Sequence, residues 1–270
     1  MFDKTSSDNL LLSQCDENGI LRLTLNDVGR RNALSNAMLT RLGQAFTTAD
    51  TDSSVRCIIL AANGPVFCSG HDLKELSAAR NTADQGRAFF TDVMQTCSGV
   101  MQGIVNCSKP VIAEIDGIAT AAGCQLVASC DLAIASNTSS FSTPGVHIGL
   151  FCSTPMVALS RNVSNKHAME LLLTVDIVPA DRAYAIGLIN KSVPSSDLED
   201  ATMQMAQKIA AKSSMTVATG KRAFYEQREM SLSDAYIHAS NVMVENMLAQ
   251  DASEGIDAFI QKRQPNWQDK

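Results

Sequence analysis

Short apolar runs alternate with segments of helical spacing along most of this chain, and this alternation constrains the fold more than any other feature. The strand-like runs are Leu10–Gln14, Ile20–Leu25, Val55–Ala62, Pro110–Ile115, Leu132–Ala135 and Lys191–Val193. The segments with helical spacing are Ala33–Asp50, Ala83–Asn106, Ala121–Ser129, Thr154–Arg161, Lys166–Leu173 and Ala180–Ile186. Strands that alternate with helices are typical of sheets joined by helical crossovers. The sequence therefore predicts an α/β fold.

The last part of the chain has a different pattern. No strand-like run follows Leu198, and Ala201–Lys212, Leu232–Ala249 and Ser253–Lys262 all have helical spacing. Periodicity therefore predicts an α/β core over residues 1–200 and a helical region over residues 201–270. Because no low-complexity linker separates the two parts, we expect them to pack together.

Charge and hydropathy exclude several classes of partner. The 270-residue chain carries a net charge of −6, which argues against general binding to nucleic acids or membrane surfaces. Its longest apolar stretch, Ile118–Ser136, is interrupted by Gln125 and Asp131 and is too polar for a membrane span. If the chain binds a polyanion, its basic residues must be gathered locally.

Cysteine usage and the first residues bear on the compartment. None of the eight cysteines forms a C-x-x-C pair, and most lie in apolar runs, where a free thiol packs as a small hydrophobic group. This pattern favours a reducing compartment. The polar start Met1–Asn9 is neither a secretory signal nor an Arg-rich transit peptide. We expect a cytoplasmic protein, with a mitochondrial matrix protein that has lost its transit peptide as the alternative.

Two turns rich in small residues come directly after strand-like runs. Gly64–Leu73 follows Val55–Ala62, while Asp116–Gln125 follows Pro110–Ile115 and leads into a helix. Small residues at a helix start let a ligand approach backbone N–H groups that lack a partner, and the helix dipole adds positive potential. Two such groups from separate loops can hold one oxygen that becomes negative during a reaction. The same small residues also occur at such turns for packing alone.

Several ordered motifs make the chain resemble the crotonase superfamily, also called the enoyl-CoA hydratase/isomerase family. The motifs are Arg31-Asn32-Ala33-Leu34, Phe67 to Lys74, Gly117 to Asp131, Phe141-Ser142-Thr143-Pro144, and Glu254-Gly255-Ile256 with Phe259 and Lys262-Arg263. The resemblance runs from about Leu11 to Trp267. It implies a crotonase-like ββα spiral core and a C-terminal helical region that mediates homotrimers, which often pair into hexamers.

The resemblance also implies a CoA thioester as substrate or ligand, with no permanently bound cofactor. It assigns an oxyanion hole to the backbone N–H groups of His71 and Ala122. The residues that it assigns to CoA contacts, some of them in a neighbouring subunit's site, are Arg30, Arg31, Cys68, Ser69, Asp72, Leu73, Lys74, Phe259 and Lys262. Arg30 and Arg31 would lie near the CoA phosphates, to which arginine forms bidentate contacts. Taken alone, each arginine is equally well explained as a solvated loop charge.

The chain departs from the family at the two glutamates of a standard hydratase. One glutamate follows the glycine-rich turn and the other follows the next Phe-x-x-Pro, and together they handle the water and the α-carbon proton. Those positions here are Gln125 and Gly145. Neither exchanges a proton near neutral pH, whereas each general acid or base contributes about 10²–10⁴ in rate. We therefore expect at best a weak enoyl-CoA hydratase or isomerase.

Three explanations of this departure stay open. In the first, another group replaces the glutamates, and the candidates are His147, Cys152, Ser153 and Cys124. Histidine suits acid/base chemistry, although a lone histidine is more often structural and a buried thiol is more often inert. In the second, the reaction needs only the oxyanion hole, as in decarboxylation or hydrolysis of a CoA thioester. In the third, the protein binds acyl-CoA without turnover.

Other kinds of site fit the sequence poorly. No G-x-S-x-G elbow is present, which disfavours a Ser-His-Asp hydrolase, and no G-x-G-x-x-G follows a strand, which disfavours dinucleotide binding. None of the four histidines is spaced i, i+3 or i+4 from another, so we expect no metal site.

Overall fold

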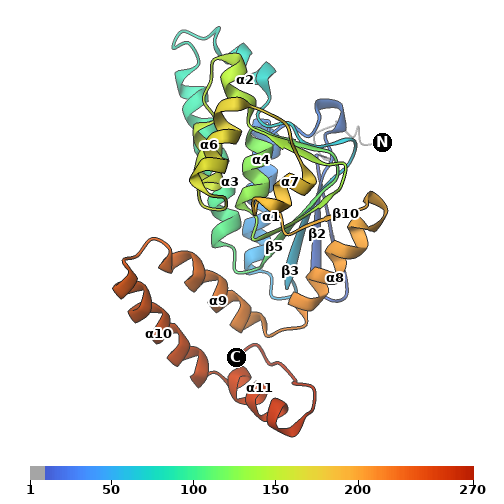
Figure 1. Cartoon of the computed structure of the whole chain (residues 1–270), viewed down its shortest axis with the longest axis vertical. Helices are drawn as coiled ribbons and strands as arrows, with labels where there is room; N and C mark the ends of the chain where they lie inside the picture. Colours follow the sequence, from blue (N-terminus) through green and yellow to red (C-terminus); the bar gives the residue numbers. More distant parts are fainter. Residues whose placement is uncertain (1–9) are drawn as a thin grey trace, which may run out of the picture.

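The strands form two sheets (Figure 1), in a computed structural model that describes residues 10–270 and leaves the polar start Met1–Asn9 outside the described residues. The large sheet has the order β1 (Leu11–Cys15), β2 (Ile20–Leu25), β3 (Cys57–Ala62), β5 (Val111–Ile115), β7 (Leu132–Ser136) and β10 (Lys191–Val193). The small sheet has the order β4 (Val66–Cys68), β6 (Ile118–Thr120), β8 (Ser140–Ser142) and β9 (Val178–Pro179).

Each repeat of the chain path contributes one strand to the large sheet and one strand to the small sheet. In sequence, β3, β5 and β7 of the large sheet are followed directly by β4, β6 and β8 of the small sheet, and successive turns pair in parallel. Antiparallel pairing within residues 10–270 is confined to β1 with β2 and β8 with β9. Helices return the chain to the start of the next turn. The predicted ββα spiral is therefore confirmed.

The helices cover both faces of this spiral and continue beyond it. They are α1 (Asn36–Thr51), α2 (Leu73–Ala79), α3 (Arg87–Asn106), α4 (Ala122–Ser129), α5 (Ser153–Leu159), α6 (Asn165–Thr174), α7 (Ala180–Ala185), α8 (Leu198–Ala210), α9 (Ser214–Gln227), α10 (Leu232–Leu248) and α11 (Gln250–Gln261), with 3-10 turns η1 (Val28–Arg30), η2 (Pro144–Ile148) and η3 (Ser195–Asp197). Within residues 10–270, every helix is too short or too polar to cross a lipid bilayer.

The large sheet is covered on both faces, which explains why its strands read as continuous apolar runs. In β3, Ile58 and Leu60 face the main core, where α1 and α3 pack. Ile59, between them, faces the opposite way and packs against Ala206 and Ala210 of α8. Because α8 belongs to the packing of the sheet, the core continues past residue 200. The division of the chain at that residue stays a prediction.

The helices α9, α10 and α11 extend from one end of the core as an arm (Figure 1). The arm is attached through Lys221 of α9, whose ammonium group donates to Asp131 at 2.7 Å and to the carbonyls of Ile104 and Lys109 at 2.9 and 3.0 Å. Tyr225, one turn further, donates to the same carboxylate at 2.9 Å. This cluster fixes one face of α9 against the end of α3 and the β5 edge.

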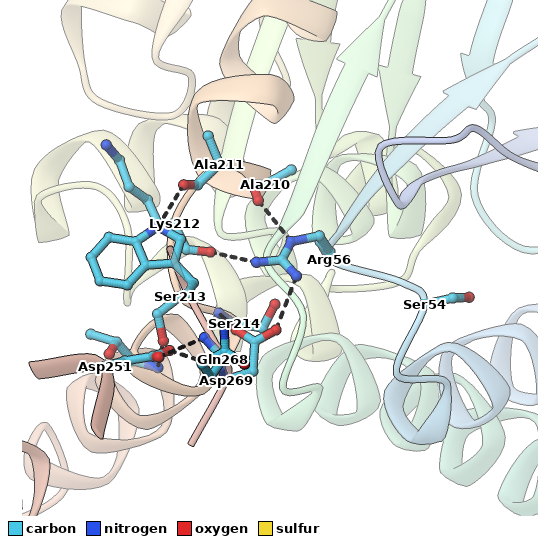
Figure 2. Close-up of polar contacts among 12 residues, drawn as sticks. Ser54, Arg56, Ala210, Ala211, Lys212, Ser213, Ser214, Asp251, Gln268 and Asp269 are labelled. Atoms are coloured by element: carbon cyan, nitrogen blue, oxygen red, sulfur yellow. Dashed lines mark hydrogen bonds and ion pairs between the residues drawn. The ribbon is translucent and has the colours of Figure 1, made fainter. Parts of the chain in front are cut away.

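The last residues of the chain fold back as a strap between the arm and the core (Figure 2). Arg56, just before β3, donates to the carbonyls of Ala210 and Lys212 and pairs with Asp269 at 3.1 Å. Trp267 donates its indole N–H to the carbonyl of Ala211 at 3.0 Å. On the other side, Asp251 of α11 accepts the N–H groups of residues 268 and 269 at 2.7 and 3.0 Å.

Acid should release this strap, because its carboxylates are stabilised in the charged form. Burial by itself raises the pKa of Asp251, but hydrogen bonds from Ser213 and from the strap outweigh it and lower that pKa below its ordinary 3.8. Hydrogen bonds from Arg263 lower the pKa of Glu254 from 4.5 to about 2. A depressed folded pKa adds stability that is present above the unfolded pKa and lost as pH falls through the folded one.

Trp267 is the only tryptophan, so its emission reports the strap directly. We expect the emission to shift to longer wavelength as pH falls from about 4.5, the ordinary pKa of Glu254, toward about 2, its pKa in the folded protein, with Asp251 losing its charge below its ordinary 3.8. Asp251→Ala should show the shifted emission already at pH 7, whereas the exposed Asp257→Ala should not. An unshifted spectrum in Asp251→Ala would show that the carboxylate does not hold the strap.

Candidate functional site

The turn before α1 is fixed against the Gly64–Leu73 segment. The side chain of Asn32 is fully buried and donates to the carbonyls of Asn63 and Val66 at 2.9 and 2.8 Å. Leu34 then donates its N–H to the carbonyl of Gly70 at 2.8 Å and forms an isolated parallel bridge with His71. The position of the His71 backbone is therefore set from outside its own loop.

The two turns that the sequence singled out are in backbone contact. A Cβ atom at Gly70 would lie 2.9 Å from the Cβ of Ala121 and 3.1 Å from the amide nitrogen of Ala122, and Gly70 has φ +85°. A Cβ atom at Gly123 would lie only 2.2 Å from the carbonyl oxygen of Cys68. Real Cβ atoms essentially never come within 3.0 Å of another heavy atom in this way, so glycine is what permits the contact at both positions.

The amides beside this contact are free of internal partners. Ala121 has φ 52° and ψ −120°, a sparsely populated conformation for a residue with a side chain, and it directs the chain into α4. Ala122 is the first residue of α4, so its N–H has no acceptor within the helix. In the described part of the chain, the N–H groups of His71 and Ala122 donate to no protein acceptor.

The positions of the two family glutamates have very different surroundings. Gln125 is buried at 4% exposure, and its Oε1 has no hydrogen-bond partner within residues 10–270. Gly145 lies under the segment that leads into α5: a Cβ atom there would be 2.7 Å from the carbonyl oxygen of Leu150 and 2.8 Å from the Sγ of Cys152. The first position holds a neutral amide, and the second has no room for a side chain.

The candidate substitutes for the glutamates are not poised for proton transfer or attack. Burial raises the pKa of the Cys152 thiol, and burial raises that of Cys124 to about 12. Both thiols therefore stay protonated and are poor nucleophiles. His147 is exposed on η2, and Ser153 is exposed at the start of α5, where its hydroxyl donates to the carbonyl of Phe151 at 3.3 Å.

The imidazole of His71 is a second unpartnered group at this place. Both ring nitrogens are buried and have no hydrogen-bond partner in the described residues. Burial lowers the pKa of His71, so the ring is neutral at physiological pH. The loop therefore presents an uncharged side chain beside the amide of the same residue.

The residues assigned to CoA contacts fall into three groups. Cys68 is fully buried and Ser69 is half-buried, while Leu73 and Lys74 are exposed. Asp72 is the N-cap of α2: its carboxylate accepts the N–H groups of Lys74 and Glu75 at 2.8 and 3.3 Å. These positions flank Gly70 in the chain.

The arginines and the C-terminal residues lie on opposite sides of the molecule. Arg30 is 59% exposed and pairs with Asp72 at 3.4 Å, and Arg31 is exposed beside it. Phe259, at 86% exposure, and Lys262 lie on α11 and at its end. Figure 1 shows α11 at the far end of the long axis from α2. The fold therefore does not bring Phe259 and Lys262 to the Gly70 loop of the same chain.

A cavity of about 660 Å³ lies between α3, α4, α5 and α9, with Gln125 on its wall. This volume is in the range of small-molecule sites. Its apolar lining consists of Met101, Val105, Ala128, Val157 and Ala158. The side chains that α9 contributes include Arg222, Tyr225 and Glu226, and Glu229 lies in the turn just after the helix. The side of the cavity formed by α9 was not predicted from the sequence, because α9 itself was not predicted.

Comparison with known proteins agrees with this architecture. Residues 16–270 match the enoyl-CoA hydratase/isomerase family. The chain is 50% identical over 261 residues to the mitochondrial enoyl-CoA hydratase domain-containing protein 3 of Rattus norvegicus, covering 97% of this chain and 85% of that protein.

Two solved structures are also similar to this chain. The crystal structure of human enoyl-CoA hydratase domain-containing protein 3 has a TM-score of 0.91 at 48% identity, covering 96% of this chain and 100% of that one. An enoyl-CoA hydratase of Mycobacterium smegmatis also has a TM-score of 0.91 at 48% identity, covering 96% and 98%. The chain therefore belongs to the enoyl-CoA hydratase/isomerase family and has the crotonase fold.

Proposed function

We propose that this protein binds a CoA thioester of fatty-acid or related metabolism and holds its carbonyl oxygen between the amides of His71 and Ala122. The observation that carries the proposal is the backbone contact between the two loops, with both N–H groups unused. Two such donors stabilise an oxygen that gains negative charge, as in an enolate. The start of α4 adds the positive end of a helix dipole.

The same site lacks the groups that make hydration fast. Gln125 offers hydrogen bonds but no exchangeable proton, and Gly145 offers no side chain. Each missing general acid or base costs about 10²–10⁴ in rate. We therefore propose that hydration of enoyl-CoA is slow, and that binding and polarisation of the thioester are the main properties of the site.

The exposed Arg30 and Arg31 support CoA binding at the rim of this site. Both project from the turn that fixes the Gly70 loop, and neither side chain is buried. Guanidinium groups bind phosphate with two parallel hydrogen bonds, so this pair supplies the local positive charge that an acidic chain needs for a polyanionic ligand.

The arm supports assembly into a homotrimer, or a dimer of trimers. Leu232, Tyr236 and Leu248 of α10 are more than 70% exposed, as is Phe259 of α11. Large apolar side chains left exposed along two neighbouring helices fit a surface that another subunit covers. In a trimer, Phe259 and Lys262 would reach a neighbour's CoA site, which they do not reach within one chain.

The names of similar proteins favour the mitochondrial alternative over the cytoplasmic location expected from the sequence. The similar proteins of rat, mouse and human are named mitochondrial, and those names do not support a cytoplasmic location. We propose the mitochondrial matrix for this chain on the same basis.

The loop contact gives the test of the proposed function. Gly70→Ala places a Cβ atom against Ala122 at a backbone φ that favours glycine, so it should push the two amides apart. We expect its affinity for octanoyl-CoA, measured by calorimetry, to fall roughly threefold to tenfold, the value of one neutral hydrogen bond. Gly99→Ala, on α3 with no neighbour within 4 Å, is the matched control and should bind like the unmodified chain.

A second candidate, decarboxylation of a malonyl-type thioester, is favoured by the neutral lining of the site. No carboxylate stands at position 125 or 145 to repel the substrate's own carboxylate, and loss of CO₂ forms the enolate without a base. Release of CO₂ from malonyl- or methylmalonyl-CoA would establish this reaction. Binding without any product would instead identify an acyl-CoA binder.

A further inference from the structure

The inner wall of the cavity beside Gln125 is buried and largely apolar, whereas its outer wall is exposed and charged. Gln125 and the neighbouring Ala128 and Met101 are buried, whereas Arg222 of α9 is exposed. Residues 222, 225 and 226 of α9 line the cavity, and this spacing places them on one face of the helix, while Arg228 and Glu229 line it from the turn just after α9. A ligand whose reacting end lies near Gln125 therefore extends past apolar side chains and ends among charged ones.

Both acidic side chains of this outer wall already have a neighbour within the protein that carries ring or guanidinium nitrogens. Glu229 lies 3.3 Å from a guanidinium nitrogen of Arg161. Glu226 lies 3.1 Å from the Nε2 of His238. The contact with Arg161 therefore compensates one of the two negative charges of the wall within the protein itself.

The same wall carries more arginines than acidic side chains. Arg228 lies over the ring of Phe224 at 5.7 Å and donates to the carbonyl of Arg161. Arg222 has no acidic partner and no hydrogen bond within residues 10–270, although its side chain lines the cavity. The outer wall therefore carries one guanidinium that is free to bind an anion.

We infer that the cavity selects CoA thioesters whose acyl chain ends in a carboxylate, and that Arg222 receives this carboxylate. The inference rests on the proposed function, because it assigns the acyl end of the same site. The methylene groups contact Met101, Val105 and Val157 on the way. The carboxylate stays near solvent, so the cost of removing it from water is small, and an exposed ion pair of this kind contributes up to roughly fivefold in affinity.

Octanoyl-CoA and suberoyl-CoA test the inference, because they share chain length and differ in the terminal carboxylate. Calorimetry at low salt should show that the unmodified protein binds suberoyl-CoA about fivefold more tightly. The preference should shrink at high salt, since the pair is exposed. Arg222→Gln should abolish the preference, and Arg222→Glu should reverse it in favour of octanoyl-CoA. Arg87→Gln, an exposed arginine at the start of α3 away from the cavity, should keep it.

The outcomes separate this inference from the proposed function. Equal affinity for the two esters, or a preference that survives Arg222→Gln, overturns the substrate class while CoA thioester binding stands. If neither ester binds, the proposed function fails and the inference fails with it. Because Arg222 is exposed and unpartnered, Arg222→Gln and Arg222→Glu should both keep the melting temperature of the unmodified protein. A lowered melting temperature in either variant would contradict the description of Arg222 as an arginine without an internal partner.

Discussion

Gln125→Glu is expected to raise the rate of crotonyl-CoA hydration by about 10²-fold, the lower end for one general acid or base. The side chain is buried on the cavity wall, one turn of α4 beyond Ala122, so the new carboxyl takes the position at which the resemblance implies a glutamate. Burial raises the pKa of a carboxyl toward neutrality, which suits proton transfer at physiological pH. The rate of loss of the enoyl absorbance measures the effect.

Two companion variants give this experiment its controls. Gln125→Met keeps the side-chain volume without an acid and should leave hydration slow. Gly145→Glu should add nothing and should lower the melting temperature, because Leu150 and Cys152 occupy the space of its Cβ atom. If the unmodified chain already hydrates crotonyl-CoA at the rate of a standard hydratase, the role given to the missing carboxylates is wrong.

The second large effect is on stability: Lys221→Ala should lower the free energy of unfolding by about 3–5 kcal/mol. The Lys221 side chain is only 7% exposed, and its ammonium group donates to Asp131 and two backbone carbonyls. Its removal leaves the carboxylate of Asp131, a side chain that is 14% exposed, with Tyr225 and one backbone N–H but without a counter-charge. An unpaired buried charge is far more costly than the pair is stabilising.

Urea denaturation at a fixed protomer concentration measures this loss, because assembly would otherwise change the apparent stability. Lys208→Ala, an exposed lysine near the end of α8, is the control and should change stability by less than about 0.5 kcal/mol. Lys221→Met combined with Asp131→Leu removes both charges and should recover part of the loss. Equal stability of Lys221→Ala and Lys208→Ala would show that the cluster does not anchor the arm.

The α/β class was predictable from the sequence because the large-sheet strands and most helices have strong periodic patterns, whereas the spiral was predicted from the resemblance to the crotonase family. The strands β4, β6 and β8 span three residues each, too few for a pattern, and were missed. The helix α9 was missed because Thr216, Val217 and Gly220 weaken its helical signal, although it packs firmly through Lys221. Tertiary contacts, rather than local propensity, determine that helix.

Part of the candidate site, namely the position of its two loops, was also predictable from the sequence. The motifs located the two loops, and the glycines at 70 and 123 are the residues that allow their contact. The crowding of Gly145 by Cys152 was not predictable, because no spacing rule relates the two positions. The N-cap role of Asp72 had a signal, since Asp-x-x-Glu at the start of α2 is a capping pattern.

The position of α9 has a thermodynamic consequence. One face of this helix forms a wall of the cavity beside Gln125, while the helix also joins the core to the exposed apolar surface of α10 and α11. With the acyl chain bound there as proposed, any partner that shifts α9 on assembly should change the affinity for that chain. Linkage is reciprocal, so a bound acyl chain would change the association constant of the subunits by the same factor.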